Sequence, residues 1–190
     1  MLTEHKTKTI HFFIDEQNQK QGEYQSFYNN GQLWEHAFYI NDNLHGEYKY
    51  YYYNGKLWEH AFYQHDRLHG EYKFYHDDGQ LCEHSFYLNG ELHGEYTYYH
   101  DNGKLSIHAF YINGNIHGEG TCFYENGNLS ECASFQNGIN HGAFKTYGED
   151  GTLKYATFYY QDKDLEINPD TLTEKDKVYI LMSGRLPPRD

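Results

Sequence analysis

The chain has 190 residues and a formal net charge of −13 at pH 7 with histidine neutral, which argues against nucleic acid and anionic membrane lipid as partners. Its 22 tyrosines and 12 phenylalanines far outnumber its 2 methionines, so aromatic rings supply most of the apolar area for burial. No apolar run has the length of a membrane span, and residues 1–6 are too polar for a signal peptide. The three cysteines, Cys82, Cys122 and Cys132, cannot all pair in disulfides. A cytoplasmic location is therefore expected.

Residues 1–21 are expected to contain one strand that covers an end of the fold. Segment 9–14 resembles the second strand of a degenerate repeat that lacks its preceding turn. A covering segment is needed there because an open edge strand invites pairing with other chains.

Residues 22–165 consist of six repeats of 24 residues without an insertion. The repeats open at Gly22, Gly46, Gly70, Gly94, Gly118 and Gly142. An Asn-Gly or Asp-Gly pair follows each opening glycine, as at Asn54-Gly55, and this pair between alternating aromatic residues is a strong hairpin signal. Each repeat is therefore predicted to form one β-hairpin, with a looser turn such as 64–69 leading into the next.

The hairpin turn is expected to hold three residues, with Gly55 as the bulge residue. The predicted cross-strand pairs are Tyr51 with Leu57, Tyr50 with Trp58, Lys49 with Glu59, Tyr48 with His60 and Gly46 with Phe62. This register places one aromatic set on a single face, with Gly46 making room for the phenyl ring: Tyr48, Tyr50, Trp58, His60 and Phe62. The other face carries Tyr51 and the glutamates, which are expected to be solvated. Hairpins this small must stack, so the expected fold class is all-β, an elongated single antiparallel sheet on the order of 60 Å long.

Residues 166–190 are expected to form a tail with a short capping helix. Segment 173–176 resembles a capping box with Asp in place of the usual Glu or Gln. Val178, Leu181 and Met182 are predicted to share the buried side of that helix.

No residue pattern predicts catalysis, a cofactor or a metal site. Equivalent histidines in successive hairpins, such as His60 and His84, should lie about 10 Å apart, beyond the reach of one zinc ion. A structural role is the favoured interpretation of the histidines, with proton sensing as the alternative. Cys122 and Cys132 are predicted to be diagonal neighbours on one face that fill space, with a dithiol switch as the alternative.

The repeated unit resembles a known family. It reads Gly-Glu-Tyr-x-x-Tyr-Tyr-x-Asn-Gly-x-Leu, followed by Phe-Tyr-x-Asn-Gly-x-x-His-Gly as in 110–118. This is similar to the MORN repeat, and most similar to the bacterial and viral variant often described as a YwqK-type antitoxin. The resemblance covers residues 9–165 and implies a hairpin-per-repeat sheet used for protein association, without catalytic residues.

The sequence as a whole predicts a non-enzymatic scaffold that binds a protein through a tyrosine-rich sheet face, since Tyr and Trp concentrate binding energy. A basic partner is electrostatically favoured, and the chain is expected to be a monomer or a weak homo-oligomer through its sheet ends. An antitoxin or inhibitor that neutralises a toxin or host enzyme, and a structural component of a particle or membrane-proximal assembly, are the alternatives. The candidate binding residues are Trp34, Tyr48, Tyr50, Trp58, Tyr72, Phe74, Tyr96 and Tyr98.

Overall fold

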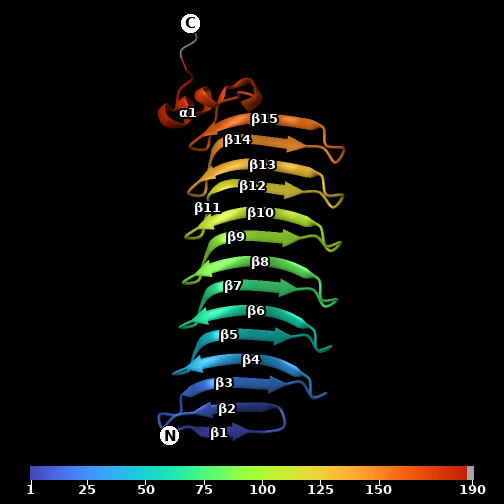
Figure 1. Ribbon diagram of the computed structural model, residues 1–190, viewed down its shortest axis with the longest axis vertical. Coiled ribbons are helices and arrows are strands. Elements are labelled where there is room, and N and C mark those ends of the chain that lie inside the picture. Colours follow the sequence, from blue (N-terminus) through green and yellow to red (C-terminus); the bar gives the residue numbers. More distant parts are fainter. Residues whose placement is uncertain (188–190) are drawn as a thin grey trace. The chain divides into compact units, whose positions relative to one another are not determined.

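The computed structural model describes residues 1–187, and over these residues 16 strands form one antiparallel sheet that a short C-terminal helix follows (Figure 1). The strand order in the sheet is the order along the chain, with β11 pairing only to β10. The fold class predicted from the repeats is therefore confirmed as all-β. The chain divides within β9 into two compact units, Met1–Gly94 and the residues from Glu95 onward, which are described separately below.

The strands of the first unit are β1 (Thr3–Lys6), β2 (Ile10–Ile14), β3 (Lys20–Phe27), β4 (Leu33–Ile40), β5 (Asn43–Tyr51), β6 (Leu57–Gln64), β7 (Arg67–Tyr75), β8 (Leu81–Leu88) and the start of β9 (Glu91–Tyr99). The second unit contains the rest of β9 and β10 (Leu105–Ile112), β11 (Asn115–Ile116), β12 (Gly118–Phe123), β13 (Leu129–Gln136), β14 (Ile139–Tyr147), β15 (Leu153–Tyr160) and β16 (Lys163–Asp164). A 3₁₀ turn, η1 (Pro169–Thr171), and the helix α1 (Glu174–Ser183) follow.

The Asn-Gly turn within each hairpin has the three-residue form that the sequence predicts. In the second repeat, the N–H of Gly55 donates to the carbonyl of Tyr52 at 2.8 Å, and the N–H of Tyr52 donates to the carbonyl of Lys56 at 2.8 Å. Gly55 has φ of 82°, a left-handed conformation that glycine adopts without strain. The Asn54 side chain closes the turn by accepting from the N–H of Lys56 at 2.9 Å.

The turn between successive hairpins is tight, so the prediction of a looser connection was wrong. Gln64 pairs with Arg67, and the two residues between them, His65 and Asp66, have φ of 50° and 61°. Two residues with positive φ are typical of the type I′ turn that matches strand twist. The Asp66 carboxylate also accepts from the N–H of Leu44 in the previous hairpin at 2.7 Å, which helps to hold this unusual conformation.

A β-bulge at the start of the second strand of a hairpin changes the predicted register, as seen in β4, β6, β8, β13 and β15. Tyr51 pairs with Leu57 as expected, but the next pair is Tyr50 with Glu59, so Trp58 has no partner of its own across the hairpin. The observed pairs beyond the bulge are Tyr50 with Glu59, Lys49 with His60, Tyr48 with Ala61, Glu47 with Phe62 and Gly46 with Tyr63. One extra residue exchanges the two faces of a strand, so the predicted partners of Lys49, Tyr48 and Gly46 were wrong.

The opening glycine makes room for a ring, although for a different one from that predicted. Gly46 has φ of 115°, and a Cβ on it would lie 3.4 Å from Cβ of Phe38 in the preceding hairpin. Gly70 has the same relation to Phe62, at 3.5 Å. At Gly94 a Cβ would come within 3.0 Å of Cβ of Phe86, so these three glycines lie against the phenylalanine of the repeat before, whereas Gly22 and Gly118 have no such neighbour and Gly142 faces Ser134.

The first unit begins with a hairpin that the sequence did not indicate. β1 pairs with β2, from Thr3 opposite Ile14 to Lys6 opposite His11. The Thr7 hydroxyl accepts from the N–H of Ile10 at 3.1 Å and so forms the turn that no Asn-Gly pair marks. The expectation that segment 9–14 lacks a preceding turn was therefore wrong.

Adjacent repeats are joined at the turn edge by recurring side-chain contacts. The Tyr52 hydroxyl donates to the carbonyl of Tyr75 in the next repeat at 2.8 Å, and the Asn54 amide donates to the carbonyl of Asp77 at 3.0 Å. The equivalent Tyr28 hydroxyl donates to the carbonyl of Tyr51 at 2.7 Å. The first and second repeats therefore each satisfy carbonyls of the repeat that follows, which makes these repeats mutually dependent.

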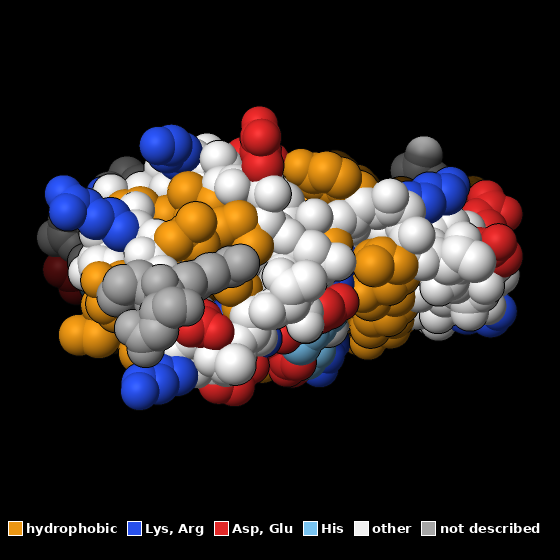
Figure 2. Space-filling model, turned by 90° about the horizontal axis from the view of Figure 1, so that it is seen from above, with side chains coloured by type: hydrophobic (Ala, Val, Ile, Leu, Met, Phe, Trp, Pro, Cys, Tyr) orange, Lys and Arg blue, Asp and Glu red, His pale blue; other side chains and the backbone are white. Residues whose placement is uncertain are grey.

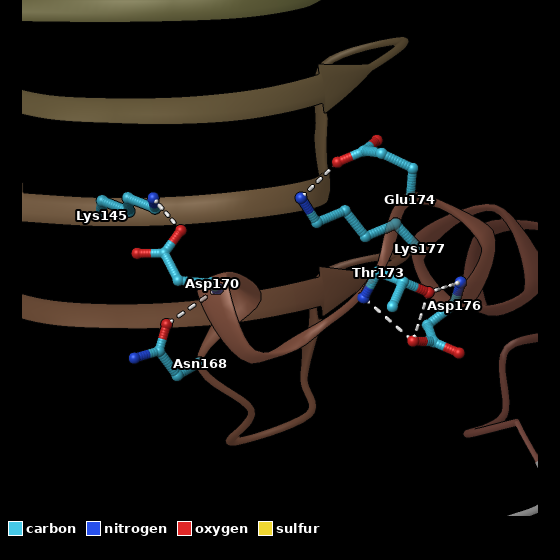
Figure 3. Close-up of polar contacts among 7 residues, drawn as sticks. All are labelled: Lys145, Asn168, Asp170, Thr173, Glu174, Asp176 and Lys177. Atoms are coloured by element: carbon cyan, nitrogen blue, oxygen red, sulfur yellow. Dashed lines mark hydrogen bonds and ion pairs between the residues drawn. The ribbon is translucent and has the colours of Figure 1, made fainter.

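The C-terminal helix begins with the predicted capping box. The Thr173 hydroxyl accepts from the N–H of Asp176 at 3.2 Å, and the Asp176 carboxylate accepts from the N–H of Thr173 at 2.9 Å (Figure 3). The helix ends at Gly184, which is left-handed with φ of 67°. Within residues 1–187 no helix is long and apolar enough to cross a membrane.

The buried side of α1 differs from the prediction. Ile180 is fully buried in a small core with Phe158 of β15 and Leu172. Val178 and Met182 are 54% and 82% exposed, so their predicted burial was wrong, whereas Leu181 does pack against this core. A helix of ten residues has too few apolar positions for a periodic pattern to define its buried side.

An ion pair fixes the segment before α1 to the sheet. Nζ of Lys145 on β14 lies 2.5 Å from the Asp170 carboxylate in η1 (Figure 3). On the same face Phe158 pairs with Ala143, at the position where earlier repeats carry glutamate. The smaller side chain leaves room beside Phe158 for the helix.

Candidate binding surface

The register defines two chemically different faces in the first unit. The first, here called the aromatic face, carries the rings Tyr24, Trp34, Tyr39, Tyr48, Tyr50, Trp58, Tyr63, Tyr72, Phe74 and Tyr87 with the acids Glu35, Glu59 and Glu83. The second, here called the acidic–histidine face, carries Glu23, Glu47, Glu71, His36, His60, His84, Lys49, Lys73, Phe38, Phe62 and Phe86.

The bulge tryptophan is the centre of a ring cluster on the aromatic face. The ring of Trp58 lies 4.7 Å from that of Tyr50, 5.7 Å from that of Tyr52 and 6.0 Å from that of Phe74. Trp34 lies 5.7 Å from Tyr50 and is 39% exposed. The structure thus brings four of the candidate binding residues into one contiguous cluster that extends over successive hairpins.

Pairs of tyrosines recur beside this cluster with nearly constant geometry. Tyr48 and Tyr63 meet edge to face, with centroids 5.5 Å apart and an interplanar angle of 73°. Tyr72 and Tyr87 do the same at 5.7 Å and 71°. Edge-to-face contacts suit the ring quadrupole, so each pair stabilises the same side-chain arrangement in these repeats. The candidate residues Tyr48 and Tyr72 therefore lie on the same face as the cluster.

The aromatic face also contains carboxylates, which the sequence-based register had placed in solvent. Glu35 pairs with Tyr50 across the strand junction, and Glu59 pairs with Phe74. Desolvation raises the pKa of both carboxyl groups, and in Glu35 the positive charge of Lys20 opposes that effect. The prediction that all glutamates lie on a solvated face was therefore wrong, because the bulge turns Glu59 onto the opposite side.

The neighbouring tyrosines respond to the same environment. Burial raises the pKa of Tyr63 to about 12, with the Glu59 charge adding to the effect. Burial likewise raises the pKa of Tyr39 to about 12, and the negative charge of Glu35 raises it further. These hydroxyls remain protonated at neutral pH and can donate hydrogen bonds to a ligand.

The acidic–histidine face is internally paired. Nε2 of His60 donates to Glu47 at 2.9 Å, and Nζ of Lys49 lies 2.7 Å from the same carboxylate. The Lys49 and His60 contacts lower the pKa of Glu47, and the first of these is the larger. The histidine column therefore lies against carboxylates rather than on the aromatic face, which corrects its predicted position.

In the second unit the candidate residues Tyr96 and Tyr98 lie on β9. Tyr96 packs edge to face on Tyr111 at 5.8 Å, and Tyr98 is 36% exposed. Figure 2, viewed from the end at which α1 lies, shows hydrophobic side chains gathered in patches that charged side chains border. The second unit thus repeats the tyrosine pair. It has no tryptophan cluster, because Trp34 and Trp58 both lie in the first unit.

The cysteines are free thiols and do not form the predicted pair of neighbours. Cys122 pairs with Glu131, whereas Cys132 pairs with Thr121, so the two side chains lie on opposite faces of the sheet. Burial raises the pKa of both thiols. In the described part of the chain no group of three or more His, Cys, Asp or Glu side chains is arranged to hold a metal ion.

The fold and its surface define a hairpin-repeat protein with one aromatic and one charged face. The MORN repeat variant model matches residues 20–41, 44–65, 68–89, 92–113, 116–137 and 140–162, well over half of the chain. The chain belongs to this family of repeat scaffolds, whose members are generally non-enzymatic.

The remaining comparisons show only distant similarity. Among solved structures, the chain is similar to TarM, with 11% identity and a TM-score of 0.23 over 73% of this chain and 22% of that one. It is also similar to an alternansucrase solved with isomaltononaose, with 13% identity and a TM-score of 0.19 over 89% of this chain and 16% of that one. The chain thus spans less than a quarter of either structure. No curated protein matches it.

Proposed function

We propose that the chain is a non-enzymatic scaffold that binds a protein partner through the aromatic face of its first unit. The observation that carries this proposal is the Trp58 cluster, in which partly exposed rings from adjacent hairpins lie 4.7–6.0 Å apart on paired strands. Tyr and Trp contribute large, rigid contact area at low entropic cost, and strands hold them in place before binding.

The opposite face is less suited to binding because its polar groups already have partners. Glu47 is bound by both Lys49 and His60, and Glu71 by Lys73 and His84. A partner that covered these pairs would remove water from several charges without offering them new contacts. Covering the aromatic face is more favourable, because its exposed apolar surface contributes to binding when it is removed from water.

Neutralisation of a toxin or a host enzyme is one specific form of this proposal, because such an inhibitor also acts by covering a surface of its target. Its support is the resemblance of the repeat to the YwqK-type variant. A structural role in a particle or membrane-proximal assembly is another form. The activity of the isolated partner with and without the chain separates them, since only an inhibitor changes it. A cytoplasmic setting agrees with the free thiols of Cys82, Cys122 and Cys132.

Adjacent tyrosines allow a matched test. Tyr50 lies in the aromatic cluster, whereas Tyr51 lies near Lys49 and Glu47 on the other side of the strand. Quantitative affinity purification from the native cell would compare the parent chain with Tyr50→Ala and Tyr51→Ala. We expect loss of the partner from Tyr50→Ala alone. Equal capture by all three proteins would refute the proposal.

A further inference from the structure

The hairpin of the first repeat, formed by β3 and β4, has a cation of its own on the aromatic face. Nζ of Lys20 lies 4.6 Å from the ring centroid of Tyr39 and 5.0 Å from that of Tyr24. These two rings meet edge to face at 5.7 Å and 72°. The ammonium also attracts the half-buried Glu35 carboxylate. Two tyrosine faces and a carboxylate thus form a site that an alkylammonium group occupies.

The next hairpins repeat the rings and the carboxylate but lack the cation. Leu44 stands 24 residues after Lys20, where it pairs with Tyr39, and Leu68 follows at the same spacing and pairs with Tyr63. The tyrosine pairs Tyr48–Tyr63 and Tyr72–Tyr87 have interplanar angles of 73° and 71°, close to the 72° of the Tyr24–Tyr39 pair in the first repeat. The arrangement of the two rings is therefore preserved in repeats where leucine stands in place of the lysine.

The carboxylates of these hairpins differ in how far they are satisfied. Glu83 accepts a hydrogen bond from the Ser85 hydroxyl at 2.8 Å. The residue equivalent to Ser85 beside Glu59 is Ala61, which has no hydroxyl, and over residues 1–187 Glu59 takes part in no hydrogen bond or ion pair. A half-buried carboxylate without a partner is costly, and a cation placed beside it recovers that cost.

We propose that Tyr48, Tyr63 and Glu59 form a binding site for a lysine or arginine side chain of a basic segment in the protein partner. This inference rests on the proposed function, because it specifies which chemistry the aromatic face recognises. A cation over a tyrosine ring gains from the ring quadrupole, and the carboxylate adds a charge-assisted hydrogen bond. The net charge of −13 favours the approach of such a segment.

The test uses a short fluorescein-labelled peptide of alternating arginine and serine, with a second peptide in which citrulline replaces arginine. Citrulline keeps the shape of the side chain but has no charge. Binding to the full chain is followed by fluorescence anisotropy. We expect saturable binding of the arginine peptide and about tenfold weaker binding of the citrulline peptide. Equal binding of the two peptides would overturn the inference.

Matched variants locate the site on the chain. Glu59→Gln and Glu47→Gln remove the same charge from opposite faces, and we expect about tenfold weaker binding for the first and a change within about twofold for the second. Lys20→Leu should strengthen binding by vacating the first site, whereas Lys8→Leu, which removes the same charge from an exposed position, should strengthen it less. Equal effects within either pair would indicate diffuse attraction and overturn the inference. Thermal melts of all four variants establish that they fold.

The native partner distinguishes this inference from the proposed function. If Tyr50→Ala abolishes capture of the partner while Glu59→Gln leaves it unchanged, the aromatic face binds the partner without this cation site, and only the inference fails. If neither variant affects capture, the proposed function fails as well. Loss of capture with both variants, together with arginine-dependent peptide binding, supports both.

Discussion

Nε2 of His60 lies 2.9 Å from Oε1 of Glu47, on the face of the sheet opposite to Tyr50 and Trp58. The contact recurs between His36 and Glu23 at 2.8 Å. It depends on the bulge at Trp58, which turns the histidine of each second strand toward the glutamate of the first. The two faces therefore differ in electrostatics: one has paired charges, and the other has half-buried carboxylates among rings.

This difference predicts opposite effects for two similar substitutions. The pKa of Glu47 is lowered by the Lys49 and His60 contacts, so its stabilising contribution is present above its ordinary pKa of 4.5 and is lost as pH falls through the folded value. Glu47→Gln should therefore lower the free energy of unfolding at neutral pH by about 0.5–1 kcal/mol, as expected for a partly exposed charged network. Chemical denaturation at neutral and acidic pH measures the loss and its decline in acid.

Glu59→Gln should have the opposite sign. Desolvation raises the pKa of Glu59, so its contribution to stability is fully present below the unfolded pKa and is lost as pH rises through the folded value. At neutral pH the ionised carboxylate is then unfavourable, and the neutral amide should raise the melting temperature. The gain should shrink in acid, where Glu59 is protonated. A lower melting temperature at neutral pH would contradict this account of the aromatic face.

The hydroxyl of Tyr52 should contribute to coupling between repeats. Its hydrogen bond to the carbonyl of Tyr75 is lost in Tyr52→Phe, which should reduce the free energy of unfolding by about 1 kcal/mol. Tyr53→Phe removes a hydroxyl from a neighbouring residue that is 61% exposed and should have no measurable effect. Urea denaturation of both variants provides the comparison, and equal stabilities would show that the inter-repeat bond adds nothing.

The small core under α1 should be sensitive to truncation. Ile180 is fully buried against Phe158 and Leu172, so Ile180→Ala should lower the free energy of unfolding by about 2–4 kcal/mol or melt the helix separately from the sheet. Met182→Ala, at a position 82% exposed on the same helix, serves as the control and should change little. Calorimetry distinguishes a single transition at lower temperature from separate melting of the helix and the sheet. If both variants melt like the parent chain, α1 does not contribute to the stability of the second unit.

The repeat pattern predicted the hairpins and most of the candidate surface, and it failed where one residue was added to a strand. Asn54 and Gly55 fix a three-residue turn through their own backbone preferences, so the pair of Tyr51 and Leu57 followed from local sequence. The bulge at Trp58 has no such signal, because alternation assumes an unbroken pleat. The tyrosines of the first strands kept their face, whereas Glu59 and His60 exchanged sides. The cation site was missed for that reason, since Glu59 was assigned to solvent.

Site-specific photo-crosslinking tests the central claim most directly. A benzophenone amino acid is introduced at Tyr50 or at Tyr51, two adjacent tyrosines on opposite sides of β5, and each protein is irradiated in its native cell. The binding of a protein partner by the aromatic face predicts a discrete crosslinked product from position 50 and none from position 51. A product from position 51 alone, or equal products from both, would contradict the assignment of the aromatic face as the binding surface.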